Sequence, residues 1–145
     1  MALSVGTKAP AFTVKDTQGN TVSLSDYSGK TVVLYFYPKD DTPGCTREAC
    51  SFRDNYAVYQ GKDVAVFGVS GDDESSHQAF TSKFSLPFPL LADTSKSLMQ
   101  SYGVESGGYA KRVTYIIDSS GTISHVYDSV NTDTHAQDII ADLGL

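Results

Sequence analysis

Residues 31–45, TVVLYFYPKDDTPGC, carry the clearest structural pattern in this chain. Residues 31–37 are apolar on both faces of an extended chain, which is typical of a central strand covered by helices on both sides. Thr42 is a good N-cap residue, and Pro43 suits the first helical position because its missing N–H would have no partner there. The stretch therefore predicts a buried strand that passes through a short loop into a helix.

Cys45 falls near the third position of the predicted helix. Free backbone N–H groups and the positive end of the helix dipole favour an anion there, so they favour the thiolate form of the cysteine. A thiolate is the nucleophilic form, and Cys45 is therefore a candidate nucleophile. The alternative is an inert buried thiol, because free cysteine is often buried and Cys45 shares a helical stripe with Ala49, Phe52 and Tyr56.

Cys50 follows Cys45 by five positions. On a continuous helix this spacing separates the two Cα atoms by roughly 8–9 Å, whereas a disulfide needs about 4.4–6.8 Å. The two thiols can therefore pair only if the helix unwinds locally. Cys50 is accordingly either a thiol that resolves an oxidised Cys45 or a helix-surface thiol without a role.

The rest of the chain alternates strands and helices. Segments around 12–14 and 21–24, separated by a Gln-Gly-Asn turn, predict an N-terminal β-hairpin. Strand–helix alternation followed by a hairpin and a terminal helix predicts an α/β thioredoxin-like fold, with a central mixed β-sheet flanked by helices. No repeat or linker interrupts the sequence, so we expect a single domain over residues 1–145. The further strands are expected at 63–70, 113–117 and 122–127, and the helices at 43–60, 73–84, 95–102 and 133–142.

Composition limits the partners and the compartment. Eleven Lys and Arg against seventeen Asp and Glu give a net charge of −6, which argues against a nucleic-acid-binding surface. The chain has no run of about 18 apolar residues and no apolar stretch typical of a signal peptide, so we expect no membrane partner and no export. Two cysteines are too few for a structural disulfide framework, and their use suits a reducing compartment. We therefore expect a cytoplasmic protein.

Several segments carry a family resemblance. Pro38, Thr42 and Cys45, spaced as P-x-x-x-T-x-x-C, resemble the active-site signature of the peroxiredoxins. The run GCTREACSFRD, residues 44–54, is similar to the peroxiredoxin Q subgroup, also called bacterioferritin comigratory protein. The resemblance covers nearly the whole chain, because three other segments match the family in the same order, at residues 6–12, 24–30 and 112–118.

The resemblance implies a thiol-dependent peroxidase that acts on hydrogen peroxide and organic hydroperoxides. Cys45 is then the peroxidatic cysteine, which becomes a sulfenic acid, and Cys50 resolves it as an intramolecular disulfide. Thioredoxin, or a similar dithiol protein, is the implied reductant. Members of this subgroup are often monomers, and we expect a monomer that uses no cofactor and no metal.

Four more residues complete the expected site. The Thr42 hydroxyl is an available hydrogen-bond donor for the peroxide, and Pro38 would shield the sulfur from water. The resemblance selects Arg112, whose guanidinium is always charged and offers five donors to a thiolate and a peroxide together. It also suggests that Glu48, one turn after Cys45, orients that arginine. On the residues alone, an arginine at the start of a strand is more often a solvated side chain, and Glu48 is explained nearly as well as an exposed first-turn acid.

Other functions remain as alternatives. A thioredoxin-like thiol–disulfide oxidoreductase would carry C-x-x-C and a proline before a late strand, whereas this chain has C-x-x-x-x-C and no proline after Pro89. A metal or Fe–S protein would need more ligands, since two thiolates supply half of a zinc site. A secondary role as a non-catalytic holdase has no sequence signature and stays open. The histidines have no metal-ligand spacing, and we expect surface or half-buried side chains at His77, His125 and His135.

Overall fold

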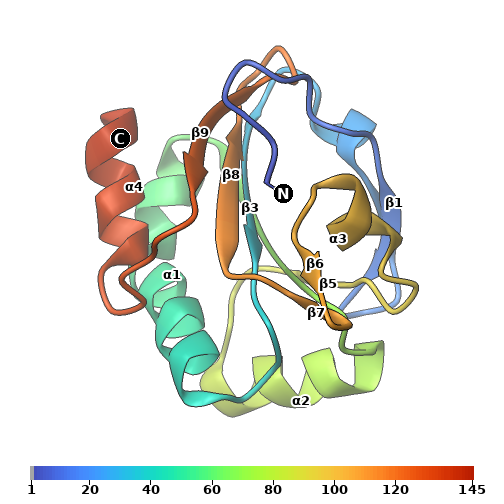
Figure 1. Cartoon of the computed structure of the whole chain (residues 1–145). Helices are drawn as coiled ribbons and strands as arrows, with labels where there is room; N and C mark the ends of the chain where they lie inside the picture. Colours follow the sequence, from blue (N-terminus) through green and yellow to red (C-terminus); the bar gives the residue numbers. More distant parts are fainter. Residues whose placement is uncertain (1) are drawn as a thin grey trace.

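The computed structural model describes residues 2–145 and places one large sheet between two layers of helices (Figure 1). Met1, the first residue of the expected domain 1–145, lies outside the described residues. Along the chain the elements are β1 (Thr13–Asp16), β2 (Thr21–Ser23), the 3-10 helix η1 (Leu24–Tyr27), β3 (Thr31–Phe36), α1 (Pro43–Gly61), β4 (Val64–Ser70), α2 (Glu74–Phe84), β5 (Leu90–Ala92), α3 (Ser97–Ser101), β6 (Glu105–Ser106), β7 (Tyr109–Ala110), β8 (Val113–Ile117), β9 (Ile123–Tyr127) and α4 (His135–Leu143).

The strand β3 lies inside a seven-stranded mixed sheet with the order β2-β1-β5-β4-β3-β8-β9. It pairs in parallel with β4 and antiparallel with β8. Its side chains alternate between the two faces, so that Val32 and Leu34 enter one core while Val33 and Tyr35 enter the other. Both cores exclude water, which explains why residues 31–37 are apolar in an unbroken run.

The two cores are covered by different helices. Phe52 of α1, Phe80 of α2 and Ile139 of α4 belong to the core on one face of the sheet. Leu98 and Met99 of α3 belong to the core on the other face. Figure 1 shows the same division, with α1 and α4 packed together on one side of the sheet and α3 on the opposite side. The predicted α/β fold, with its mixed sheet flanked by helices and its N-terminal hairpin, is confirmed.

Three short strands were not predicted. β5 completes the sheet by pairing with β4 and with β1, so the N-terminal hairpin extends the main sheet. The strands β6 and β7 form a separate small hairpin. The helix expected at 95–102 is shorter because Lys96 adopts a left-handed backbone conformation with φ 65°, and α3 begins only after it.

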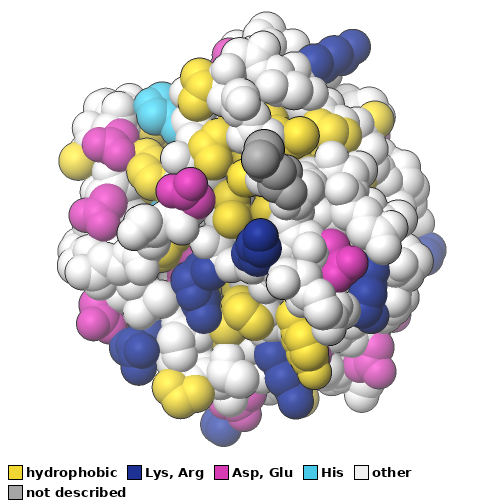
Figure 2. All heavy atoms as spheres, in the orientation of Figure 1, with side chains coloured by type: hydrophobic (Ala, Val, Ile, Leu, Met, Phe, Trp, Pro, Cys, Tyr) yellow, Lys and Arg dark blue, Asp and Glu magenta, His cyan; other side chains and the backbone are white. Residues whose placement is uncertain are grey.

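The loop 37–42 leaves the sheet at the carboxyl end of β3 and leads into α1. In Figure 1, α2 runs across this end of the sheet, at the bottom of the view. The face shown in Figure 2 carries Lys and Arg side chains interspersed with Asp and Glu rather than one continuous basic stripe. Among residues 2–145, no helix combines the length and the apolar character needed to cross a bilayer.

Candidate active site

The N-terminus of α1 begins as the sequence predicts. Thr42 is the N-cap with extended backbone angles, Pro43 opens the helix, and the Thr46 N–H donates to the Thr42 carbonyl at 2.8 Å. The Thr42 hydroxyl, however, does not cap the helix. It donates instead to the Lys39 carbonyl at 2.9 Å, which ties the loop to the start of the helix.

Cys45 is the third residue of α1 and is 1% exposed. Its predicted helical stripe is confirmed, because Ala49 and Phe52 are buried with it against the sheet and Tyr56 is half-buried on the same face. Cys50 is half-buried, both cysteines are free, and α1 is continuous across them. The first turn of the helix therefore holds a sulfur atom against the core.

Arg112 lies far from Cys45 in the sequence but contacts it in the folded protein. It directly precedes β8, whose first residue Val113 pairs with Phe36 at the end of β3, so the strand register brings Arg112 to the start of α1. Its Nη2 donates to Cys45 Sγ at 3.3 Å, and its Nη1 donates to Glu48 at 2.7 Å. Burial alone would lower the pKa of Arg112, but Glu48 and Cys45 raise it above its usual value. The guanidinium is thus a fixed charge that joins the sulfur to a carboxylate.

Glu48 is fully buried one turn after Cys45, so its interpretation as an exposed acid is wrong. Burial raises the pKa of Glu48 to about 7, although Arg112 acts in the opposite direction. Its Oε1 accepts from Arg112, while its Oε2 has no hydrogen-bond partner among the described residues. The side chain therefore holds the arginine at a considerable desolvation cost.

Two residues at the site were missed by sequence reasoning. A Cβ atom at Gly44 would lie 3.1 Å from Arg112 Nη2, so the glycine leaves room for the guanidinium. His135, the first residue of α4, lies with Nε2 2.8 Å from Thr114 Oγ1 and 3.8 Å from Glu48 Oε2. Burial lowers the pKa of His135 to about 4, so the ring is neutral near pH 7. No local pattern marks His135, because its partners lie on strands and helices distant in sequence.

The expectation for the histidines was therefore only partly correct. His125 is half-buried, but His77 and His135 are 0% and 1% exposed, so the prediction of surface or half-buried rings is wrong for both. Each ring has polar partners inside the protein, which offsets the cost of burying it. Among residues 2–145, no group of three or more His, Cys, Asp or Glu is arranged to hold a metal ion.

Cys50 lies in an environment that disfavours its thiolate. Burial raises the pKa of the Cys50 thiol, Arg53 lowers it and Asp54 raises it, and the net shift is upward. Unlike Cys45, this sulfur has no arginine hydrogen bond among the described residues. The structure therefore distinguishes the two cysteines by their surroundings as well as by their positions on α1.

A cleft of about 310 Å³ opens beside Pro38. Gly71 and Asp72 after β4 form one wall, and the β6–β7 hairpin forms another with Tyr109, whose side chain is 55% exposed. Lys96 lies at the same cleft. This hollow borders Pro38, in the loop that leads into α1, whereas Cys45, Thr42 and Arg112 are not among its lining residues.

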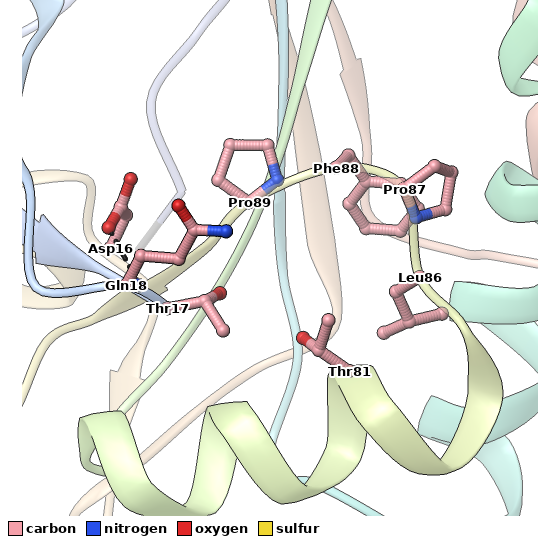
Figure 3. A pocket seen from close by; sticks show the side chains of 8 residues that line it. All are labelled: Asp16, Thr17, Gln18, Thr81, Leu86, Pro87, Phe88 and Pro89. Carbon is pink, nitrogen blue, oxygen red and sulfur yellow. Dashed lines mark hydrogen bonds between the residues drawn. The ribbon is translucent and has the colours of Figure 1, made fainter.

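Another pocket, of about 180 Å³, lies elsewhere on the molecule (Figure 3). It lies between residues 16–18 at the β1–β2 turn and residues 86–89 after α2, and Thr81 points into it. None of the predicted site residues lines it. This pocket is therefore separate from the Cys45, Arg112 and Glu48 cluster at the start of α1.

A buried cysteine at the first turn of α1, held by an arginine on a thioredoxin-like sheet, defines a cysteine-based redox site. Comparison with known proteins agrees with this class. The family model described as AhpC/TSA family matches residues 5–126. Chloroplastic peroxiredoxin Q of Triticum aestivum is 48% identical over 130 residues, covering 88% of this chain and 60% of the relative. A putative peroxiredoxin bcp of Coxiella burnetii is 43% identical over 151 residues, covering 99% of this chain and 100% of the relative.

Solved structures agree with the sequence comparison. Peroxidoxin BcpB of Mycobacterium tuberculosis has a TM-score of 0.92 and 32% identity, and the match covers 98% of this chain and 97% of that one. A Xanthomonas campestris bacterioferritin comigratory protein, described as having alkyl peroxide reduction activity, has a TM-score of 0.90 and 27% identity, over 97% and 98% of the two chains. The chain belongs to the AhpC/TSA family, and it resembles the peroxiredoxin Q members of that family. It spans only about 60% of the length of the wheat relative.

Proposed function

We propose that this protein is a thiol-dependent peroxidase that reduces hydrogen peroxide and organic hydroperoxides. The observation that carries the proposal is the double contact of Arg112, which donates to Cys45 Sγ at 3.3 Å and to Glu48 at 2.7 Å. The contact places a permanent cation beside the sulfur, where it stabilises a thiolate and the negative charge that develops on peroxide oxygens. An inert buried thiol needs no such partner.

The reaction begins with attack of the Cys45 thiolate on the terminal oxygen of the peroxide. A sulfur–oxygen bond forms, the O–O bond breaks, and the other oxygen leaves with the bonding electrons and takes up a proton as water or an alcohol. The sulfur is oxidised to a sulfenic acid and the peroxide is reduced. The Arg112 guanidinium and the backbone N–H groups near Gly44 and Cys45 donate to the reacting oxygens in this proposal.

Thr42 and Pro38 complete the site on the solvent side. Because the Thr42 hydroxyl donates to the Lys39 carbonyl, its oxygen is free to accept the hydroperoxide hydrogen, and it can donate to the peroxide only after rotating. Pro38 borders the cleft of about 310 Å³, and its proposed role is to shield the sulfur from water. The organic part of a hydroperoxide would occupy this cleft against Tyr109, and the alkyl peroxide activity of the Xanthomonas relative supports such a substrate.

We propose that Cys50 then resolves the sulfenic acid. Its sulfur attacks Cys45 Sγ, the disulfide forms and water leaves. The five-residue spacing on a continuous α1 requires the helix to unwind for this step. A thioredoxin-like dithiol protein then reduces the disulfide and returns both thiols.

We also propose that the protein acts as a monomer in the cytoplasm. Among the described residues, the exposed large hydrophobic side chains are Val5, Val58 and Tyr109, which lie on separate parts of the chain. Permanent dimers usually bury a more extensive apolar surface. Close cysteines that cycle between thiol and disulfide suit a reducing compartment. Sedimentation of the reduced protein and cell fractionation test these two statements.

The test of the proposed function is peroxide consumption coupled to thioredoxin, thioredoxin reductase and NADPH. The wild type should turn over many equivalents of peroxide. Cys50→Ser should consume about one equivalent, because Cys45 is oxidised but not resolved by this route, and Cys45→Ser should consume none. A wild type that reduces protein disulfides but not peroxides would instead identify a thiol–disulfide oxidoreductase.

A further inference from the structure

The loop that carries Pro38 and Thr42 is held from behind by a buried polar cluster, which we call the loop clamp. Asp40, in the middle of the loop, is only 7% exposed. The loop clamp consists of Asp40 and the four side chains bonded to it, which come from the end of β3, the segment after β4 and the first turn of α2: Tyr37, Asp72, Ser76 and His77.

The carboxylate and the backbone N–H of Asp40 both have partners within the clamp. Its carboxylate accepts from the Tyr37 hydroxyl at 2.5 Å through Oδ1 and from the Ser76 hydroxyl at 2.8 Å through Oδ2. Its backbone N–H donates to Asp72 Oδ2 at 2.8 Å, and that oxygen also accepts from Ser70 at 2.7 Å. The loop has no regular secondary structure at this point, so these bonds fix its path.

His77 is the innermost member of the clamp and is 0% exposed. Its Nε2 lies 2.9 Å from the Leu91 carbonyl of β5, which can only accept, so Nε2 carries a proton. Its Nδ1 lies 2.7 Å from Asp40 Oδ2, and a hydrogen bond joins the two groups. The ring therefore connects the loop to the centre of the sheet through one rigid side chain.

The proposed reaction gives the clamp no chemical step. None of its members contacts Cys45 or Arg112 among the hydrogen bonds and ion pairs described, yet a buried acid and a buried histidine are costly to keep in a core. The clamp holds the residue that lies two positions from both Pro38 and Thr42. A displacement of about 1 Å at a reacting centre can cost a factor of about 100 in rate. Positioning is therefore the role that these bonds can perform.

We propose that His77 is a positioning residue of the peroxidase site, acting through Asp40 on the loop that carries Pro38 and Thr42. The inference rests on the proposed function. A second link between α2 and the loop, from Lys83 to Asp41 at 2.8 Å, is solvent-exposed and contributes little. The buried bonds to Asp40, including the one from His77, therefore hold the loop in place.

Two substitutions of His77 test its hydrogen bonds to Asp40 and to Leu91 one at a time. In His77→Asn the side-chain amide nitrogen can take the place of Nδ1 and keep the bond to Asp40, while the bond to Leu91 is lost. In His77→Gln the amide nitrogen can take the place of Nε2 and keep the bond to Leu91, while the bond to Asp40 is lost. Each variant removes one hydrogen bond to a buried acceptor and creates space, so the two should lose similar amounts of thermal stability.

The rate constant for peroxide attack is measured by competition with a haem peroxidase for limiting hydrogen peroxide, because the chain has no tryptophan to report oxidation. His77→Gln should react at least about tenfold more slowly than the wild type, and His77→Asn should recover most of the rate. The rate at which iodoacetamide alkylates Cys45 is measured in the same two variants with Cys50→Ser added. This rate should be the same in both, because alkylation depends on the thiolate and not on the position of the loop.

A second pair of variants, Ser76→Ala and Ser75→Ala, tests the same role with smaller changes that should not prevent folding. Ser76→Ala removes a donor to Asp40 from a half-buried position and should slow peroxide attack several-fold, as expected for a loosened contact. Ser75→Ala, at the exposed neighbouring position, should not.

Equal rates in His77→Asn and His77→Gln, together with no effect of Ser76→Ala, would overturn the positioning role. A parallel loss of alkylation would also overturn it, because the thiolate rather than the loop would then be disturbed. A wild type that consumes no peroxide would instead refute the proposed function, and the positioning role with it.

Discussion

At the scale of single residues, Arg112 is the group on which the site depends. It precedes a buried strand and reaches a sulfur on a helix that is distant in sequence. We expect Arg112→Ala to slow peroxide attack by about 10²–10³, the range for loss of one preorganised donor. The same competition assay measures the rate constant.

Arg47→Ala is the matched control for Arg112→Ala. Arg47 also lies near the N-terminus of α1, but its side chain is 53% exposed and forms an ion pair with Asp133. Its substitution should leave the rate within a factor of about two, as for a surface ion pair of little energetic weight. A normal rate in Arg112→Ala, or an equal loss in both variants, would contradict the assignment.

The raised pKa of Glu48 predicts that the stability of the protein depends on pH in an unusual way. Its pKa is about 7 in the folded protein against 4.5 as the ordinary value, so the folded state holds more protons than the unfolded chain between these two values. The free energy of unfolding should therefore fall as pH rises through this window, by on the order of 2–3 kcal/mol from this group alone. Glu48→Gln keeps an acceptor for Arg112 and removes the effect.

Urea unfolding at pH 5 and pH 8 measures this difference. Relative to the wild type, Glu48→Gln should be more stable at pH 8 than at pH 5. Asp26→Asn, which removes an exposed carboxyl, is the control and should show no such trend. Parallel stability profiles for the wild type and Glu48→Gln would mean that Glu48 is not protonated more readily in the folded state.

At the scale of elements, α1 must change for the two cysteines to meet. The reduced form has a continuous helix across Cys45 and Cys50. Its later part is tied to α4, because the Ala136 N–H donates to the Ser51 hydroxyl at 3.1 Å and the Tyr59 hydroxyl donates to the Ala136 carbonyl at 2.6 Å. Unwinding should therefore start from the N-terminal turns of α1, before the region held by α4.

Amide hydrogen exchange of reduced and oxidised protein tests this expectation, after peptide mapping has established the Cys45–Cys50 link. Oxidation should lower protection somewhere between about residues 42 and 55 and leave the sheet unchanged, as for a locally unfolding element. Cys50→Ser, treated with the same peroxide, should keep the protection of the reduced form in this segment. Equal protection in both redox forms of the wild type, or only intermolecular dimers, would rule out Cys50 as an intramolecular resolving cysteine.

At the scale of the whole molecule, the sequence predicts those features that depend on local pattern. The run 31–37 predicts β3 and its two covered faces, and Thr42 and Pro43 predict where α1 begins. β5 was missed because it is three residues long and follows two prolines, which leaves no periodicity to detect. The β6–β7 hairpin, with two residues in each strand, is shorter still.

The environment of the site depends on contacts between distant segments, and residue types alone do not determine it. The resemblance selected Arg112 and Glu48, but their mutual bond and the complete burial of Glu48 follow only from the register of β3 with β8. His77 and His135 were expected near the surface because a lone histidine carries no local sign of burial. Their partners lie on other strands and helices, so only the folded chain reveals them.

In the proposed reaction, Cys45 is the group that reacts with peroxide. The most direct measurement adds one equivalent of hydrogen peroxide to reduced Cys50→Ser protein in the presence of a sulfenic-acid trap, and locates the label by mass spectrometry. We predict rapid labelling of Cys45 and none in the double variant Cys45→Ser/Cys50→Ser. An unlabelled Cys45, with the peroxide still present, would show that Cys45 is not the peroxidatic cysteine.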